Sequence, residues 1–137
     1  GRVVIQTFFP DHFAIRCAAR NEFDEFARIE LESRRALGYP PFGRLVKILL
    51  QGPDPEDVAR EVESDAEVLR ERREKCQILG PAPSPIAKIQ GRFRYQILLK
   101  SSSSRTLHAA LKRLEGKRPA PRRSVERIID VDPQSML

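Results

Sequence analysis

The segment Gly80–Lys100, GPAPSPIAKIQGRFRYQILLK, decides the fold of this chain, because a proline-rich stretch and a turn at Gln90-Gly91 lead into one long strand. Successive side chains of a strand point to opposite faces of a sheet. The strand therefore presents two sets of residues: Arg92, Arg94 and Gln96 on one face, and Phe93, Tyr95 and Ile97 on the other. Arginines beside aromatic rings suit a single-stranded nucleic acid, with cations for phosphates and rings for bases. An ordinary edge strand with a solvated basic face would show the same pattern.

Positive charge is concentrated around this strand. Between Lys88 and Arg127 the sequence has 12 Lys and Arg residues and 2 acidic residues, so this basic block carries +10, whereas the whole chain carries +6. A block of one sign is typical of a surface that binds a polyanion, either nucleic acid or an acidic protein tail. Four of its residues equally fit a solvated loop without a ligand: Lys117, Arg118, Arg122 and Arg123.

Composition narrows the class of protein. With 137 residues, of which 40% are hydrophobic, the chain is long enough for one modest core. No apolar run approaches the ~20 residues needed to cross a membrane, so no membrane contact is expected. Cys17 and Cys76 lie far apart in the sequence, which predicts no disulfide framework and fits a reducing cytoplasm. His12 and His108 have no metal-ligand spacing with the cysteines, so we expect no metal site.

The first part of the chain, residues 1–37, predicts a strand followed by two helices. The β-branched run Arg2–Thr7 has the composition of a buried strand. Asp11 is placed to cap a short helix that reaches about Arg20, and Asn21 to cap a second helix that ends at Gly38. We interpret this segment as a brace between two units.

From residue 44 onward strands and helices alternate. Strands are expected at Leu45–Leu50, at Ile78–Leu79 with a continuation at Ile86–Ile89, at Arg92–Lys100 and at Val125–Val131. One helix is capped by Asp54 and runs to about Lys75, and another begins at the N-cap Ser104. The order β-α-β-β-α-β is that of the split βαβ, ferredoxin-like fold. This is an α+β domain with a four-stranded, mostly antiparallel sheet and both helices on one face.

The sequence lacks the patterns of an active site. It contains no glycine-rich phosphate loop and no nucleophile with a base partner, so neither catalytic residues nor an enzymatic activity are expected for this segment. Asp130 and Asp132 lie two residues apart at the end of the last strand, on one face. A solvated strand end explains this pair more simply than a divalent cation does.

Four ordered motifs carry a resemblance: Gly1–His12 (GRVVIQTFFPDH), Arg34–Phe42 (RRALGYPPF), Leu79–Lys100 (LGPAPSPIAKIQGRFRYQILLK) and Asp130–Leu137 (DVDPQSML). Together they span nearly the whole chain, and they resemble the C-terminal end of the primosomal protein N′ (PriA) family. These bacterial, ATP-dependent 3′–5′ DNA helicases restart replication and promote primosome assembly. The resemblance implies that residues 1–37 end the second RecA-like helicase lobe. It implies that residues 38–137 are a C-terminal domain whose fold is related to a ribosomal small-subunit protein.

The resemblance also implies cofactors and partners. The family's ATP, magnesium and zinc sites would lie upstream, so no cofactor is expected in this segment. The family's C-terminal domain binds DNA, single-stranded or forked, and helps form a pocket for the acidic tail of single-stranded-DNA-binding protein. Other primosome proteins are further expected partners, and the expected location is the bacterial cytoplasm, at the nucleoid.

Specific residues follow from these expectations. Phosphates would be contacted by four cations and bases by two rings: Lys88, Arg92, Arg94 and Lys100, and Phe93 and Tyr95. In the tail pocket Arg105 matches the family's basic residue. Ala109 stands where some members have a glutamine, and it cannot donate a side-chain hydrogen bond.

Two other functions remain open at this point. A structural protein-interaction domain would grip an acidic tail without touching DNA, and a ribosome-like module would prefer RNA. The face of the sheet that meets a nucleic acid is also open. If Phe93 and Tyr95 pack under the helices, only the arginine face is available, and it would contact phosphates without stacking on bases.

Overall fold

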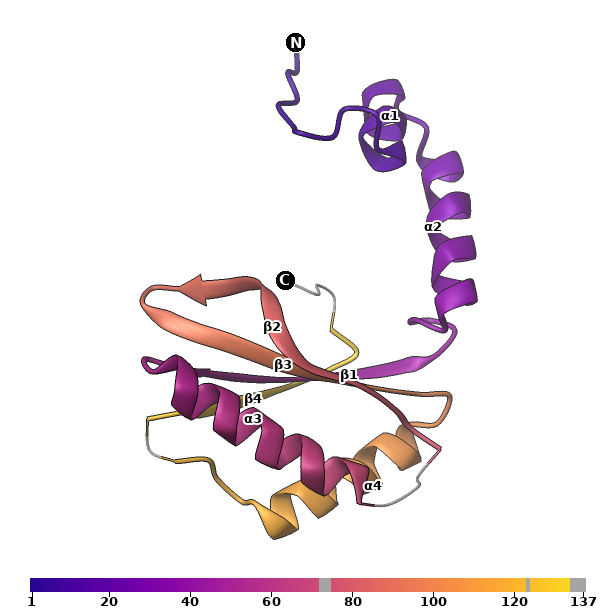
Figure 1. The fold of residues 1–137 in the computed structure, drawn as a ribbon. Helices are drawn as coiled ribbons and strands as arrows, with labels where there is room; N and C mark the ends of the chain where they lie inside the picture. The colour runs from indigo at the N-terminus through magenta and orange to yellow at the C-terminus, as the bar shows by residue number, and fades with distance from the viewer. Residues whose placement is uncertain (72–74, 123, 134–137) are drawn as a thin grey trace. The chain divides into compact units, whose positions relative to one another are not determined.

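The computed structural model describes residues 1–71, 75–122 and 124–133 (Figure 1). Arg123 and the end of the last motif, Gln134–Leu137, lie outside the described residues. The chain divides into two compact units, Gly1–Leu37 and Gly38–Leu137. No helix among the described residues is long and apolar enough to cross a bilayer. The assignment of the first unit to a helicase lobe stays a prediction.

The larger unit is a four-stranded antiparallel sheet with two helices on one face (Figure 1). Its strands are β1 (Arg44–Gly52), β2 (Gln77–Ile89), β3 (Arg92–Ser101) and β4 (Glu126–Val131), in the spatial order β2-β3-β1-β4. The helices are α3 (Pro55–Arg70) and α4 (Ser104–Lys117). This arrangement confirms the predicted α+β class and the split βαβ order of elements.

The core lies between the helices and one face of the sheet. Alternate residues of the two central strands, among them Ile48, Ile97 and Leu99, are fully buried there. Each helix contributes an apolar stripe: Val58, Val62, Ala66, Val68 and Leu69 from α3, and Leu107, Ala110, Leu111 and Leu114 from α4. Because strand side chains alternate, the intervening residues of β3, including Arg92 and Arg94, belong to the opposite face of the sheet.

The two ends of α3 are set by side chains. At its start Asp54 accepts hydrogen bonds from two backbone N–H groups of the first turn, and Pro55 occupies the first helical position, as predicted. The helix ends at Arg70 and does not reach the expected Lys75. There the guanidinium of Arg113 donates hydrogen bonds to two of the last backbone carbonyls, which satisfies the end of the helix.

The start of α4 differs from the prediction by one residue. Its N-cap is Ser103 and not Ser104, and the Ser103 hydroxyl makes no capping hydrogen bond. The hydroxyl of Ser101 accepts a hydrogen bond from the N–H of Ser103 itself, at 3.2 Å. The N-cap side chain therefore leaves the first backbone N–H groups of α4 without the hydrogen bond that a serine usually supplies.

A tight hairpin joins β2 and β3. Its two turn residues, Gln90-Gly91, have positive φ angles of 49° and 78°, which match the twist of the flanking strands. The pairing of β2 with β3 shifts register twice, between Leu79 and Ala82 and between Pro83 and Lys88. Prolines cannot donate ladder hydrogen bonds, which explains why this strand is irregular. β2 nevertheless runs as one strand and is not split into two pieces.

The smaller unit consists of α1 (Phe13–Arg20) and α2 (Phe23–Leu37). The strand expected over Arg2–Thr7 is not formed: these residues have no regular structure and most of them are exposed. A strand needs a neighbour for its backbone hydrogen bonds, and no other strand occurs in residues 1–37. The β-branched composition of Arg2–Thr7 was therefore not enough to predict a strand.

The predicted caps of these helices were also wrong. His12, not Asp11, caps α1, because its Nδ1 accepts a hydrogen bond from the N–H of Ala14 at 3.3 Å. Asn21 does not begin α2 but ends α1, with a left-handed φ of 57°. Asparagine tolerates this conformation better than most residues, which suits it to the C-terminal end of a helix.

Candidate nucleic-acid and partner interface

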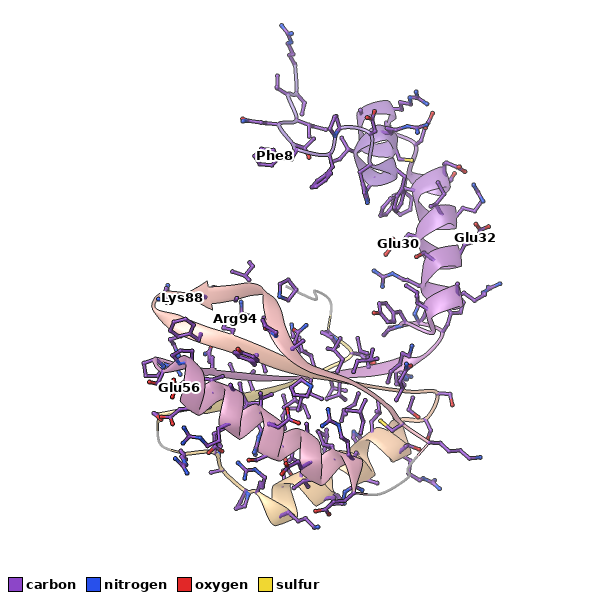
Figure 2. The ribbon with its side chains drawn as sticks, in the orientation of Figure 1. Phe8, Glu30, Glu32, Glu56, Lys88 and Arg94 are labelled. Carbon is purple, nitrogen blue, oxygen red and sulfur yellow. The ribbon has the colours of Figure 1, made fainter. Side chains whose placement is uncertain are left out.

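Arg94 lies within the β2–β3 hairpin, where Figure 2 labels it, and its side chain is largely buried. It is 9% exposed, and its Nη1 donates a hydrogen bond to the carbonyl oxygen of Ile86 at 3.4 Å. The bond joins β3 to the part of β2 where the pairing is irregular. A phosphate could reach this guanidinium only by displacing part of the hairpin.

Arg92 forms an ion pair with an acid of the same sheet. Its Nη2 lies 3.2 Å from Oε2 of Glu126, and the same nitrogen donates to the carbonyl of Gln51 at 3.3 Å. The side chain is 40% exposed, so one part of the guanidinium still faces solvent. Arg92 is thus accessible but partly neutralised.

The two aromatic rings lie on the helix side of β3. Tyr95 packs against the core cluster, in line with the alternation that also buries Ile97. Phe93 is half-buried, and the Nζ of Lys88 stands 4.4 Å from its ring centroid, within the range of a cation–π contact. Tyr95 is thus engaged with the core, and Lys88 lies over the Phe93 ring.

The remaining two predicted DNA contacts are the lysines of this region. Lys88 is exposed at the end of β2 nearest the turn, where Figure 2 labels it. Lys100 is half-buried at the other end of the hairpin strands, with its Nζ 5.8 Å from the ring centroid of Tyr39. The six predicted residues therefore do not form one continuous basic surface.

Much of the basic block is neutralised by acids of α3. Glu61 and Asp65 lie one helical turn apart. Together they form ion pairs with Arg118, Arg122 and Arg127. Lys117 is bound by Glu71, beyond the end of the same helix. The charge count along the chain missed this pairing because the acids precede the cations by more than 40 residues. The i, i+4 spacing of Glu61 and Asp65 beside the apolar stripe of α3 was the signal that could have shown it.

The exposed face of α4 is where cations gather without such acids. Five residues line a shallow hollow on it: Ser104, Arg105, His108, Ala109 and Lys112. The structure thus brings together Arg105 and Ala109, which were predicted, and adds His108 and Lys112, which were not. Their spacing of three, four and seven residues from Arg105 places them on one face of a helix. Among the described residues neither Arg105 nor Lys112 has an acidic partner.

The acidic pair at the end of β4 is used within the sheet. Asp132 accepts a hydrogen bond from the N–H of Leu45 at 3.0 Å and one from Arg44 at 2.8 Å. The backbone hydrogen bond, with a smaller contribution from Arg44, lowers the pKa of Asp132 below its ordinary value, although burial acts against this shift. Asp130 faces Lys47, with 3.8 Å between the charged atoms. The described residues contain no group of three or more His, Cys, Asp or Glu side chains that could hold a metal ion.

Comparison with known proteins shows which family this chain is similar to. The sequence profile of the family described as "Primosomal protein N C-terminal domain" matches residues 35–134. Proteins named "Replication restart protein PriA" are similar over almost the whole chain. The one from Synechocystis is 34% identical over 99% of this chain, that from Bacillus subtilis 32% over 100%, and that from Haemophilus influenzae 32% over 99%. The chain spans only 16%, 17% and 19% of the length of these relatives.

A solved structure of a designed protein has a similar fold. The de novo designed protein Foldit4 superimposes with a TM-score of 0.51 at 12% identity, over 68% of this chain and 99% of the designed one. A likeness of this kind concerns the arrangement of elements and carries nothing about function.

Proposed function

The chain belongs to the primosomal protein N C-terminal domain family, and we propose that it is part of a bacterial replication-restart helicase. In this proposal the chain docks the acidic tail of single-stranded-DNA-binding protein and contacts DNA at stalled forks. The observation that carries the proposal is the α4 face. There Arg105 and Lys112 have no acidic partner among the described residues, while several other cations of the basic block are neutralised by α3. Cations left unpaired at a surface attract an anionic partner.

The chemistry of the α4 face fits a carboxylate-rich peptide. The Arg105 guanidinium offers parallel donors for a two-point bond to a carboxylate. The first N–H groups of α4, which the Ser103 hydroxyl leaves uncapped, add the positive end of the helix dipole. Lys112 lies two turns further along and provides a second cation for the acidic side chains of the peptide. Ala109 between them offers a small apolar contact and no hydrogen bond.

In this proposal the accessible cations of the β2–β3 hairpin contact DNA. Lys88 is exposed and Arg92 keeps 40% of its side chain in solvent, so both are available to phosphate oxygens. Lys100 is a weaker candidate because it is half-buried. In this proposal Arg94, Phe93 and Tyr95 support the hairpin. Contacts to phosphates alone carry no sequence information, which suits a protein that acts on forks of any sequence.

The parent protein would be an ATP-dependent 3′–5′ helicase that promotes primosome assembly in the bacterial cytoplasm, at the nucleoid. Its ATP, magnesium and zinc sites would belong to parts of the protein other than these 137 residues. The present chain would contribute recognition and no chemistry.

Peptide binding tests the tail site. An acidic peptide with a free C-terminal carboxylate and a fluorescent N-terminus is titrated with the wild type, with Arg105→Ala and with Arg60→Ala. Loss of charge-assisted hydrogen bonds predicts that Arg105→Ala weakens binding about tenfold or more. Arg60→Ala removes an equally positive, half-exposed side chain from α3 and serves as the matched control. Equal affinity of Arg105→Ala and the wild type would refute the assignment.

A second candidate is a protein-interaction domain that makes no DNA contact, and the internal bonds of Arg92 and Arg94 favour it. Binding of single-stranded DNA at several salt concentrations separates the two. DNA contact predicts that log K falls with log[salt] by about 0.7 per phosphate contacted. Absence of binding at low salt would leave the tail site as the function of the domain. Tighter binding of RNA than of DNA would instead favour the ribosome-like module.

A further inference from the structure

Two cations stand seven residues apart on the exposed face of α4. Arg105 and Lys112 are both exposed, and neither makes a hydrogen bond or an ion pair with another described residue. Seven residues are nearly two complete helical turns, so the two side chains leave the helix in almost the same direction. At roughly 1.5 Å per residue, their positions are about 10.5 Å apart along the helix axis. The face therefore carries two cationic points at a fixed separation.

The two points are not equivalent, because only Arg105 lies at the N-terminal end of α4. There the side chain of the N-cap residue Ser103 makes no capping hydrogen bond, so backbone N–H groups of the first turn remain as donors beside the Arg105 guanidinium. The terminal carboxylate of a peptide has two acceptor oxygens and matches such a group of donors. Lys112 offers its ammonium alone, since N–H groups in the interior of a helix are bonded within the helix. The C-terminus of an acidic peptide is therefore matched to Arg105, and an acidic side chain of the same peptide to Lys112.

The exposed charge changes sign beyond Lys112. The next exposed charged residue of α4 is Glu115, one turn further along the helix. It has no basic partner in the part of the chain that the structure describes. A carboxylate at this position repels further acidic residues of a peptide that continues along α4. The stretch of peptide that α4 can attract therefore ends near Lys112.

An extended peptide covers the separation of the two cations in a few residues. Each residue of an extended chain advances it by roughly 3.3 Å, so about 10.5 Å corresponds to about three residues. We propose that α4 selects peptides with an acidic side chain three residues before the C-terminal residue (position −3). This side chain pairs with Lys112 while Arg105 holds the terminal carboxylate. Acidic side chains at −2 and −4 point to the opposite side of an extended peptide and contribute less.

This inference rests on the tail docking proposed above. It adds the direction of the peptide along α4, with its C-terminus at Arg105, and the residue that sets its specificity, Lys112. Attraction by positive charge alone would depend on the number of acidic residues in the peptide and not on their position. A comparison of peptides that have the same net charge but differ in the position of one acid therefore isolates the inference.

Three fluorescent octapeptides of glycine and serine provide this comparison, each with one aspartate, at −2, −3 or −6. Each is prepared with a free and with an amidated C-terminus. Anisotropy titrations at low ionic strength use the wild-type 137-residue chain, Lys112→Gln and Lys112→Arg. Lys112 is exposed on α4, and glutamine and arginine are good helix formers, so both variants keep the fold. Lys112→Arg retains the charge and serves as the matched control.

The wild type and Lys112→Arg are expected to bind the free −3 peptide about threefold more tightly than the −2 and −6 peptides. Lys112→Gln is expected to bind all three equally. Equal affinity of the wild type for the three free peptides would overturn the inference, and so would a −3 preference that persists in Lys112→Gln.

The amidated peptides separate this failure from a failure of the tail site itself. The wild type is expected to bind each amidated peptide about tenfold more weakly than the free one, because the carboxylate at Arg105 is lost. That loss without a −3 preference would leave the tail site intact and overturn only the inference. Equal binding of free and amidated peptides would refute the tail site at Arg105 and the inference with it.

Discussion

Arg127 and Asp65 form a buried two-point ion pair that ties β4 to α3. The Nη2–Oδ1 distance is 2.6 Å and the Nε–Oδ2 distance is 2.7 Å, with side-chain exposures of 6% and 0%. Arg118 adds a third hydrogen bond to the same carboxylate, at 2.7 Å. The carboxylate is therefore held by two guanidinium groups of the basic block, which removes those groups from the surface available to a ligand.

Loss of one member of this cluster should be costly. Arg127→Met is expected to lower the free energy of unfolding by about 3 kcal/mol, because it leaves a buried carboxylate with fewer partners. Urea unfolding followed by circular dichroism measures the change. Arg60→Met, at a side chain 52% exposed on the same helix as Asp65, should stay within about 0.5 kcal/mol of the wild type. Equal stabilities of the two variants would contradict the structural role of the pair.

Gly80 should not accept a side chain. Its φ is +96°, and a Cβ at this position would stand 2.8 Å from the carbonyl oxygen of Gln96. Gly80→Ala is therefore expected to cost about 1–3 kcal/mol of stability. Gly116→Ala is the matched control, because that glycine lies inside α4 with nothing within 4 Å of a Cβ, and the change should stabilise by up to about 1 kcal/mol. Thermal unfolding of the two variants should shift in opposite directions, and parallel shifts would disprove this account of Gly80.

Acid should remove the contribution of Asp132. The hydrogen bond from the Leu45 N–H, with help from Arg44, lowers the pKa of this carboxyl from its ordinary 3.8 in the folded state. A depressed folded pKa stabilises the protein above the unfolded value and ceases to do so as the pH falls through the folded one. Asp132→Asn should therefore unfold at lower urea than the wild type at about pH 7, and the gap should narrow below about pH 4. A gap that is independent of pH would count against this role.

Lys88 and Arg94 should differ in their effect on DNA binding, although the sequence treats them alike. Lys88→Gln is expected to reduce the slope of log K against log[salt] by about 0.7, the loss of one phosphate contact. Arg94→Gln is expected to leave the slope unchanged and to lower stability by about 1 kcal/mol, because it loses the bond to the Ile86 carbonyl. Salt titrations with a labelled single strand measure the slopes. A reduced slope in Arg94→Gln would show that this guanidinium reaches DNA after all.

The fold of the larger unit was predictable because its signals are local. Asp54-Pro55 begins α3, Gln90-Gly91 forms the hairpin turn, and the apolar stripes of both helices follow the helical period. The strand expected over Arg2–Thr7 failed because a strand depends on a neighbour, which residues 1–37 do not contain. Local composition cannot supply that information.

The candidate site was predictable only in part, for a related reason. The net charge of residues 88–127 leaves out acids elsewhere in the chain. The positive charge of the surface, however, depends on which cations of this segment have no acidic partner. Glu61 and Asp65 pair with arginines 53 to 62 residues later in the chain, and only the tertiary structure reveals this. Arg105 was identified through the family resemblance, and the α4 geometry adds His108 and Lys112 to it.

The central claim is that the partner site lies on α4 and not on the arginine face of β3. Backbone amide chemical shifts of the labelled chain, recorded while an acidic peptide with a free carboxylate is added, test it most directly. We predict the largest shifts at Ser104, Arg105, His108, Ala109 and Lys112, and their loss in Arg105→Ala. Largest shifts at Arg92, Arg94 and Gln96, retained in Arg105→Ala, would contradict it.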